Sequence, residues 1–553
     1  MISEMLARAR KSLDLDKILG EIGSFGRYQI KNYCVILLPI ISCAQWKSQF
    51  IFNAGKVPFR CTVPECESSP PEWDTGEWGS WALGAGRCER RRTLAPGGVC
   101  APATFHENLT QACDAWLYGN QDTIVAEFDL ACQEWKRTLV GTIHSAGLFA
   151  ALPLTGYISD TFGRRTAFVL TAVSASVMGL IRSFSSSYSM YLVFEFLDAT
   201  LGSGVYSTGF ILALEMVGLN QRVLGGNMIS SAFAIGQVLL ALVAWAIPYW
   251  RTLTRVLYAP SLLFIFYYFI VEESVRWLLS KGKKKEAARI IYKAAAINRK
   301  ELSPESIKQL SEDPTPTPNI SIINGVTTSI PIDETPQRSL FSQVLRSRII
   351  ISRLFICSFW WITVTFIYYG LSINSVSLAG NSYVNYILTA LVEIPGYALS
   401  VLTLDRFGRK SAIMTSFFVC GTALIALPFI PNVAVMKSLT MVSKLCISMT
   451  FASIYIYTIE LFPTQGRSSL IGFCSMIGRI GSLSAPQTPL VVDGVHGVAA
   501  VPGVRRDGGL LRRAHAAHAR DAAPATARHH PTGGSDGGRP AHAQANRHYR
   551  GLA

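Results

Sequence analysis

Several charged side chains lie inside long apolar stretches of this sequence, and three of them are in its second half near the middle of a stretch. Glu393 lies within residues 383–404, Lys444 within residues 433–458 and Arg479 within residues 468–489. A charge in the middle of a membrane helix costs about 2.5–3.5 kcal/mol on insertion scales, so all three are candidates for a function. A guanidinium can bind a carboxylate bidentately, and that is the chemistry that Arg479 could contribute.

The sequence offers no comparable pattern for catalysis. No nucleotide-binding loop, metal-ligand spacing or nucleophile–base pair occurs in a segment that water could reach. We therefore predict that the protein is not an enzyme and has no cofactor and no metal site. The net charge of +15 could indicate a nucleic-acid partner. In a membrane protein it is explained more simply by basic cytoplasmic loops, so no nucleic-acid partner is expected.

The apolar stretches that must position these charges are long enough to cross a membrane. Half of the residues are hydrophobic and only 16% are charged, and one helix needs about 20 apolar residues to cross the bilayer core. The sequence therefore predicts an all-α polytopic membrane protein in contact with lipid. Eleven spans are predicted, over residues 32–53, 138–158, 166–186, 189–213, 223–247, 255–272, 349–371, 383–404, 411–430, 433–458 and 468–489.

Two charged motifs occur twice at one offset, which indicates a duplicated membrane half. The turn that begins at Asp160 recurs at Asp405, and the pair that begins at Glu215 recurs at Glu460. Our hypothesis is that these residues form cytoplasmic charge clusters that lock one conformation; the alternative is that they only anchor the topology. The predicted gating residues are Asp160, Gly163, Arg164, Arg165, Glu215, Arg222, Asp405, Gly408, Arg409, Lys410, Glu460 and Arg467.

A polar segment over residues 54–136 carries half of the cysteines of the chain. Clustering of this kind predicts disulfides in an oxidising compartment, and the sequon at Asn108 predicts glycosylation of the same loop. Reduced cysteines are the alternative. The pairing stays open, because six cysteines allow 15 connectivities. An extracellular loop places the N-terminus in the cytoplasm of a plasma-membrane protein. The disulfide candidates are Cys61, Cys66, Cys88, Cys100, Cys113 and Cys132.

The chain divides into five predicted parts. A cytoplasmic N-terminus over residues 1–31, which is too polar for a signal peptide, precedes a first helix bundle over 32–272. A cytoplasmic loop over 273–348 follows, with an amphipathic surface helix near 281–300 and a disordered linker near 303–338. A second bundle of five spans covers 349–489, and the fifth part is a tail over residues 490–553.

Residues 490–553 are rich in Ala, Arg, Gly and His and contain no predicted span. A metal-binding or basic tail is one interpretation, but the irregular spacing favours a disordered or out-of-frame end. If the sequence offset between the two halves is added to the position of Glu273, the corresponding position of the second half falls in this tail. A twelfth span is therefore predicted to be missing.

Several motifs in order give the chain a family resemblance. Besides the two turns and the Cys-rich loop, they are Pro248-Tyr249-Trp250-Arg251, Glu273-Ser274-Val275-Arg276-Trp277-Leu278, Glu460-Leu461-Phe462-Pro463-Thr464 and Arg479-Ile480-Gly481-Ser482. Over about residues 15–489 the chain resembles the major facilitator superfamily, specifically its carriers of organic cations, anions and zwitterions in an insect-like form. This resemblance implies twelve helices in two six-helix bundles and transport by alternating access.

The resemblance also implies the residues of a substrate site. Glu393 and Lys444 match an acidic and a basic family position, and Arg479 stands where cation-selective members carry Asp and anion or carnitine carriers carry Arg. Arg479 therefore favours anions or zwitterions, with Glu393 available for the cationic end. Glu195 departs from the superfamily, which usually has Arg there. The aromatic residues that match the family pocket are Tyr206, Phe233, Trp361 and Tyr368.

The predicted function is transport of small organic ions by alternating access, the ion being a cation, a carnitine-like zwitterion or an anion. A sugar porter is one alternative, because the motif from Glu273 to Leu278 also occurs in that class. A product that lacks its last helix and does not transport is another. A homo-oligomer remains possible.

Overall fold

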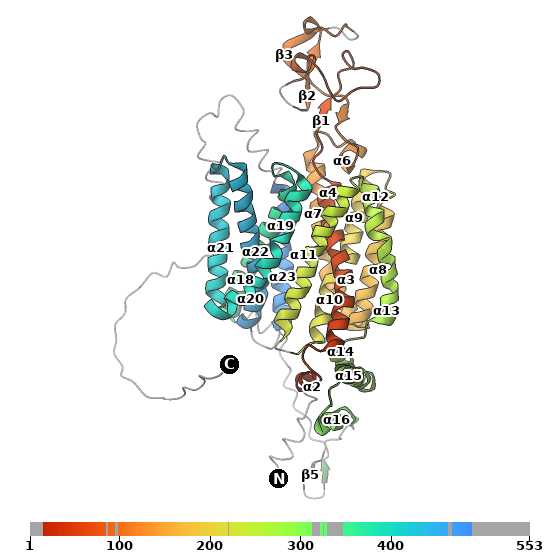
Figure 1. Cartoon of the computed structure of the whole chain (residues 1–553), viewed down its shortest axis with the longest axis vertical. Coiled ribbons are helices and arrows are strands. Elements are labelled where there is room, and N and C mark those ends of the chain that lie inside the picture. Colours follow the sequence, from red (N-terminus) through yellow and green to blue (C-terminus); the bar gives the residue numbers. More distant parts are fainter. Residues whose placement is uncertain are drawn as a thin grey trace, which may run out of the picture.

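The computed structural model describes residues 15–84, 87–94, 98–218, 221–311, 321–323, 326–328, 347–462 and 467–488. Long helices form the body of the molecule (Figure 1). A small disulfide-bonded domain stands at one end of this body, which we call the loop side, and short helices lie at the other end, which we call the turn side. The predicted tail over residues 490–553, and with it the question of a twelfth helix, lies outside the described residues.

All eleven predicted spans are helical. The first bundle contains α3 (Arg27–Ser48), α4 (Phe50–Asn53), α7 (Glu134–Phe162), α8 (Arg164–Arg182), α9 (Tyr188–Gly202), α10 (Gly204–Glu215), α11 (Arg222–Ala246), α12 (Trp250–Tyr258), η3 (Pro260–Phe266) and α13 (Tyr267–Ile270). The second contains α18 (Arg348–Asn374), α19 (Ser382–Leu391), α20 (Glu393–Phe407), α21 (Arg409–Ala426), α22 (Val433–Leu461) and α23 (Arg467–Ser484).

Within the described residues, nine helices are long and apolar enough to cross a membrane. The other two predicted spans are also helical. One is divided into α9 and α10, which meet at Ser203. The second is α23, whose apolar character is diluted by Arg467 and Arg479.

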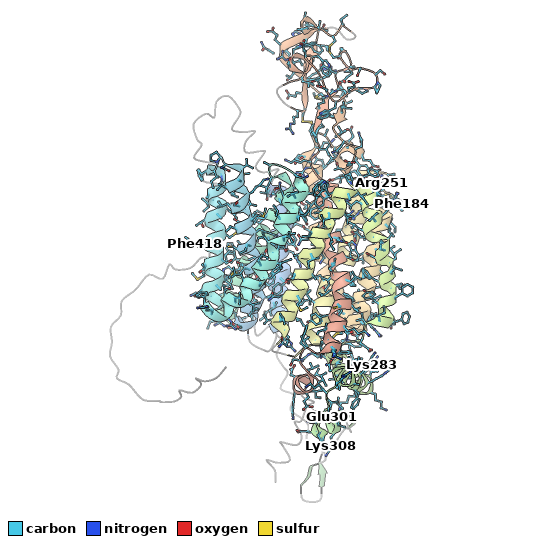
Figure 2. The ribbon with its side chains drawn as sticks, viewed as in Figure 1. Phe184, Arg251, Lys283, Glu301, Lys308 and Phe418 are labelled. Carbon is cyan, nitrogen blue, oxygen red and sulfur yellow. A yellow bond between two sulfur atoms is a disulfide. The ribbon has the colours of Figure 1, made fainter. Side chains whose placement is uncertain are left out.

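The outer surface of the bundles is apolar, as a lipid-facing surface must be. Phe418 points outward from α21 (Figure 2) and is 67% exposed, and Phe184 behaves in the same way at the end of α8. Polar and charged side chains are instead buried between the helices, among them Arg182, Glu195 and Lys444. This arrangement reverses that of a water-soluble helical protein and confirms a multi-pass membrane protein.

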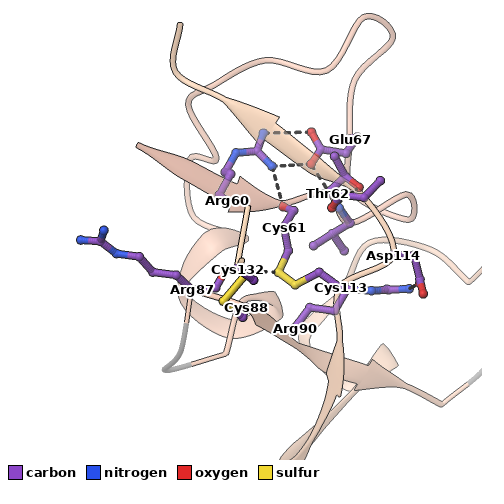
Figure 3. The surroundings of a disulfide bond; sticks show 12 residues. Arg60, Cys61, Thr62, Glu67, Arg87, Cys88, Arg90, Cys113, Asp114 and Cys132 are labelled. Carbon is purple, nitrogen blue, oxygen red and sulfur yellow. Dashed lines mark hydrogen bonds and ion pairs between the residues drawn. A yellow bond between two sulfur atoms is a disulfide. The ribbon is translucent and has the colours of Figure 1, made fainter. Parts of the chain in front are cut away.

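The loop-side domain consists of two small antiparallel sheets. β1 (Phe59–Cys61) pairs with β4 (Trp116–Tyr118), and β2 (Glu89–Thr93) pairs with β3 (Phe105–Ala112). Three disulfides join Cys61 to Cys113, Cys66 to Cys100 and Cys88 to Cys132, which is one of the pairings that the sequence left open. Figure 3 shows the first and the third of them. Arg60 Nη2 lies 3.1 Å from Glu67 Oε2 beside the first of them. Asn108 is exposed on β3, where a glycan would be accessible.

This pairing gives a first testable prediction. Digestion of the purified protein under non-reducing conditions should release peptides linked as 61–113, 66–100 and 88–132, detectable by mass spectrometry. Replacing both Cys66 and Cys100 by Ser should lower the stability of the loop-side domain by about 2–4 kcal/mol, because the loop between them is no longer closed. Any other set of linked peptides would contradict the assignment.

The turn side carries α2 (Leu15–Glu21), α14 (Val275–Ser280), α15 (Lys284–Asn298) and α16 (Pro304–Ser311). The predicted amphipathic helix is α15, but its apolar residues are not left for a membrane surface. Ile290, Ile291 and Ala294 pack against Ile18 of α2 and Leu278 of α14 in a protein core. The prediction of a disordered linker from residue 303 was wrong at its start, where α16 forms.

Candidate functional site

A small cavity lies where the two bundles meet. His144 from α7 and Phe233 and Gln237 from α11 line it on one side. Tyr368 and Tyr369 from α18 line it on the other side. Lys47 of α3 and Ser482 of α23 also line it. Side chains from both halves therefore meet at one place near the middle of the helices.

Glu393 and Lys444 are brought together beside this cavity, and they neutralise each other. Lys444 Nζ lies 2.9 Å from Glu393 Oε1, and both side chains are fully buried. Glu393 Oε2 also accepts hydrogen bonds from the hydroxyls of Tyr368, at 2.7 Å, and Tyr397, at 3.0 Å. Because this carboxylate already has a cation and two hydroxyl donors, it is not free to bind the cationic end of a substrate.

Arg479 lies next to the cavity with few partners. Its Nη1 donates to the Tyr369 hydroxyl at 3.4 Å, and its Nε is buried without a hydrogen-bond acceptor. No carboxylate of the described residues forms an ion pair with it. An Arg without an anionic partner in a membrane bundle is costly unless a ligand supplies the anion, so Arg479 is the strongest candidate contact for an anionic group.

The predicted aromatic residues divide into two groups. Tyr206 and Phe233 contact each other edge to face at 5.4 Å between ring centroids, and Lys47 Nζ lies 5.4 Å from the Tyr206 ring. Tyr368 lines the cavity and holds Lys444 Nζ 3.4 Å from its ring centroid. Trp361 is buried against Tyr455, 4.5 Å away, in the core of the second bundle and does not line the cavity.

The first bundle contains a buried charge network that the sequence analysis did not identify. Arg182 pairs with Glu195 and lies 3.0 Å from Asp198 Oδ2. His144 Nδ1 lies 2.7 Å from Glu195 Oε1, and the Tyr258 hydroxyl donates to Asp198 at 2.6 Å. Arg182 thus comes from α8 to meet two carboxylates on α9, those of Glu195 and Asp198. All of these charges lie within predicted spans, and that was the available signal.

The two bundles are joined on the loop side. Gln487 Nε2 donates to Thr142 at 2.6 Å, Ser145 donates to the Ser482 carbonyl at 3.0 Å, and Tyr386 donates to Gln237 at 3.2 Å. Within the described residues, every hydrogen bond between the bundles lies in the middle or the loop-side half of the helices. The structure is therefore closed towards the loop side.

The first predicted turn forms a compact charge cluster on the turn side. Arg164 pairs with Asp160 at 2.6 Å and approaches Glu215 at 3.7 Å. The carboxylate of Glu273 accepts from the backbone N–H groups of Arg164 and Arg165 at 2.9 and 3.1 Å. A carboxylate in this position accepts hydrogen bonds from the free N–H groups at the start of α8. Its negative charge also interacts favourably with the positive end of the helix dipole.

The other predicted gating residues have different partners. Arg222 does not pair with Glu215; it lies 3.4 Å from Asp16 on α2. In the second half Arg409 pairs with Glu460 at 2.9 Å, and Lys410 is exposed. The side chains of Asp405 and Arg467 lie outside the description, so the second cluster is only partly defined. The repeated motifs thus share an Arg–Glu contact between the turn and the end of the neighbouring helix.

The two turn glycines provide a matched pair for mutation. Both have positive φ, +106° for Gly163 and +81° for Gly408, in a region that is open almost only to glycine. A Cβ at Gly163 would lie 2.2 Å from Glu273 Oε2, whereas a Cβ at Gly408 would meet nothing within 4 Å.

We therefore expect Gly163→Ala to destabilise the protein more than Gly408→Ala. Both variants should incur backbone strain of about 1–3 kcal/mol. Gly163→Ala should in addition displace Glu273 from the start of α8. The thermal midpoint of each purified variant in detergent measures the difference. Equal losses for the two variants would contradict the importance of the Glu273 contact.

Comparison with known proteins adds to this geometry. The Major Facilitator Superfamily matches residues 130–486. The Organic cation transporter protein of Drosophila melanogaster is 31% identical over 494 residues, which cover 86% of each chain. Organic anion transporter 3 of Rattus norvegicus is 29% identical and also covers 86% of each. Solute carrier family 22 member 3 of Mus musculus is 27% identical and covers 87% of this chain and 90% of its own.

Solved structures agree in fold. The inward open conformation of the xylose transporter XylE from E. coli aligns with a TM-score of 0.52 and 13% identity, covering 89% of this chain and 94% of that chain. At this identity the likeness shows the fold alone.

Proposed function

The chain belongs to the Major Facilitator Superfamily, among its organic cation and anion transporters, and on this premise we propose that it carries small organic anions across the plasma membrane by alternating access. The observation that carries the choice of anions is the state of the two charged candidates: Glu393 is neutralised by Lys444, whereas Arg479 has no carboxylate partner among the described residues. An anionic substrate supplies that partner.

The balance of charge around the cavity supports the same substrate class. Lys47 lines the cavity, and three more cations, Arg182, Lys444 and Arg479, lie behind the lining residues. The carboxylates in the same region are those of Glu195, Asp198 and Glu393. The four cations exceed the three carboxylates by one positive charge. A monoanion balances this excess, whereas an organic cation would increase it.

The aromatic residues complete the proposed site. Phe233 and Tyr368 offer apolar surface to the hydrocarbon part of a substrate, and Tyr206 lies directly behind Phe233. An aromatic anion would place its ring among these side chains and its charge at Arg479. Trp361 has no direct part in this arrangement, because it is buried in the core of the second bundle.

Closure on the loop side supports alternating access. In the proposed cycle the contacts of Gln487 with Thr142 and of Ser482 with Ser145 break when the site opens towards the loop side. The Arg164–Glu215 and Arg409–Glu460 contacts hold helix ends together on the turn side within each half. The disulfides and the sequon at Asn108 support an extracellular loop side, and hence a cytoplasmic N-terminus.

Uptake by the purified full-length chain in proteoliposomes tests the proposal. We expect saturable uptake and counterflow of labelled benzenesulfonate, and weaker uptake of carnitine, tetraethylammonium and xylose. Preferred uptake of tetraethylammonium or carnitine would overturn the choice of anions, and preferred uptake of xylose would support a sugar porter. Protein-free vesicles are the control, and no uptake of any of the four would contradict a transport function for this chain.

A further inference from the structure

His144 has an unusual environment in the proposed carrier. Its side chain is 4% exposed, and its Nε2 has no hydrogen-bond partner among the described residues. The same residue lines the cavity between the bundles. We infer that His144 is a proton-binding site and that the carrier moves a proton together with its anionic substrate. This inference rests on the proposed function and extends it to the coupling ion.

The partner of the other ring nitrogen fixes the state of the imidazole. Glu195 pairs with Arg182 and in its ionised form can only accept hydrogen bonds, so His144 Nδ1 must carry the hydrogen that bridges their 2.7 Å contact. In neutral His144, Nε2 is then a bare acceptor on a side chain that lines the cavity. A proton can bind there without breaking any contact of the network, and the carboxylate behind the ring stabilises the resulting imidazolium.

The groups around His144 set the strength of this site. From α9, Glu195 contacts it directly, while Asp198, Tyr188 and Tyr191 lie on the same helix; Arg182 of α8 lies behind Glu195. Lys47 of α3 lines the cavity together with His144, and the centroid of the Phe50 ring of α4 lies 4.9 Å from that of the imidazole. From the other elements that pack on α7, the titratable groups on this side are Tyr206 of α10 and Arg479 of α23, whereas η6 (Ala485–Gln487) carries none.

The positive charge of Lys47 opposes protonation of His144, and the negative charge of Glu195 favours it. Binding of an anionic substrate shifts this balance towards protonation. An anion at the cavity attracts a proton to His144, and a protonated His144 attracts the anion. This coupling is reciprocal, because it is a single free energy shared by the two binding events. The charges of the anion and of the proton cancel each other, so their joint movement across the membrane carries no net charge.

Proton-driven uptake into proteoliposomes tests the inference. Benzenesulfonate serves as substrate, because a sulfonate stays ionised and does not cross the bilayer as a neutral acid. The membrane potential is clamped with potassium and valinomycin. We expect an acid-outside gradient to accelerate initial uptake at least ~5-fold, the lower end of typical coupling between two sites. A pH dye inside the vesicles should report acidification of the interior as the substrate enters. Changing the clamped potential should have no effect on the initial rate of uptake.

Variants separate the proton site from a structural role. His144→Gln should abolish both the acceleration and the dye signal while counterflow at equal pH remains measurable, which shows that the variant is folded. His106→Gln, at the other described histidine, should behave like the parent chain. Glu195→Gln leaves Arg182 paired with Asp198 and should move the midpoint of the pH dependence of uptake to lower pH, because it removes the carboxylate that contacts His144.

The outcomes distinguish this inference from the proposed function. Benzenesulfonate counterflow without any effect of the pH gradient would overturn proton coupling and leave anion transport intact. A His144→Gln variant that keeps the acceleration would overturn the assignment to this residue. A Glu195→Gln variant that loses activity equally at every pH, with an unchanged midpoint, would assign Glu195 a purely structural role. Absence of anion transport in the parent chain would overturn both proposals.

Discussion

Replacing Arg479 by Asp should reduce benzenesulfonate uptake by about 100-fold. A charge-assisted hydrogen bond contributes about 1.5–3 kcal/mol, and each 1.4 kcal/mol corresponds to a factor of ten. The new carboxylate would also repel the substrate. Arg479 has no carboxylate partner within the described residues, so the exchange breaks no ion pair that holds the bundle together. The loss should therefore appear in transport and not in thermal stability.

Two comparisons sharpen this prediction. Arg479→Lys keeps the charge but not the bidentate geometry, so it should retain more anion uptake than Arg479→Asp. Arg479→Asp should also increase uptake of tetraethylammonium, because the excess of positive charge at the cavity is removed while the aromatic side chains remain. Unchanged anion uptake by Arg479→Asp would show that the substrate anion binds elsewhere.

Replacing Lys444 by Met should destabilise the protein by about 3–5 kcal/mol, the usual cost of leaving one member of a buried ion pair alone. Among the described residues, the fully buried Glu393 would then keep only the donors of Tyr368, Tyr397 and Gln237. The fall in the thermal midpoint of the purified protein in detergent measures the effect.

A double variant separates the charge from the shape of the side chain. Glu393→Gln combined with Lys444→Met removes both charges and should recover most of the lost stability, because no unpaired charge is left. Lys437→Met, on the same helix, is the control for replacing a lysine of α22 and should have little effect. If the double variant is as unstable as Lys444→Met alone, packing and not charge explains the loss.

Much of the fold could be predicted from local properties of the sequence. Runs of about 20 apolar residues become helices in a membrane because the backbone must satisfy its own hydrogen bonds there. All eleven predicted spans are helical for this reason. The repeated motif also predicted tight turns at Gly163 and Gly408, and both residues have the positive φ that favours glycine.

Predictions that depended on partners were less complete. The spacing of Glu215 and Arg222 suggested a pair, but α2 brings Asp16 to Arg222 and α8 brings Arg164 to Glu215. The apolar face of α15 was predicted to meet the membrane surface, yet α2 and α14 cover it. In each case the deciding residue lies far away in the sequence, where periodicity and spacing carry no information.

The sequence by itself determined which residues are costly in a membrane, because that cost depends only on the residue type and the apolar stretch around it. Glu393, Lys444 and Arg479 were identified in this way. Only the tertiary structure decided which of these charges are neutralised and which are free. It pairs Glu393 with Lys444, leaves Arg479 without a carboxylate partner among the described residues, and places His144 between Glu195 and the cavity. Electrostatic energy depends on distances between atoms of different helices, and those distances exist only after the helices have packed.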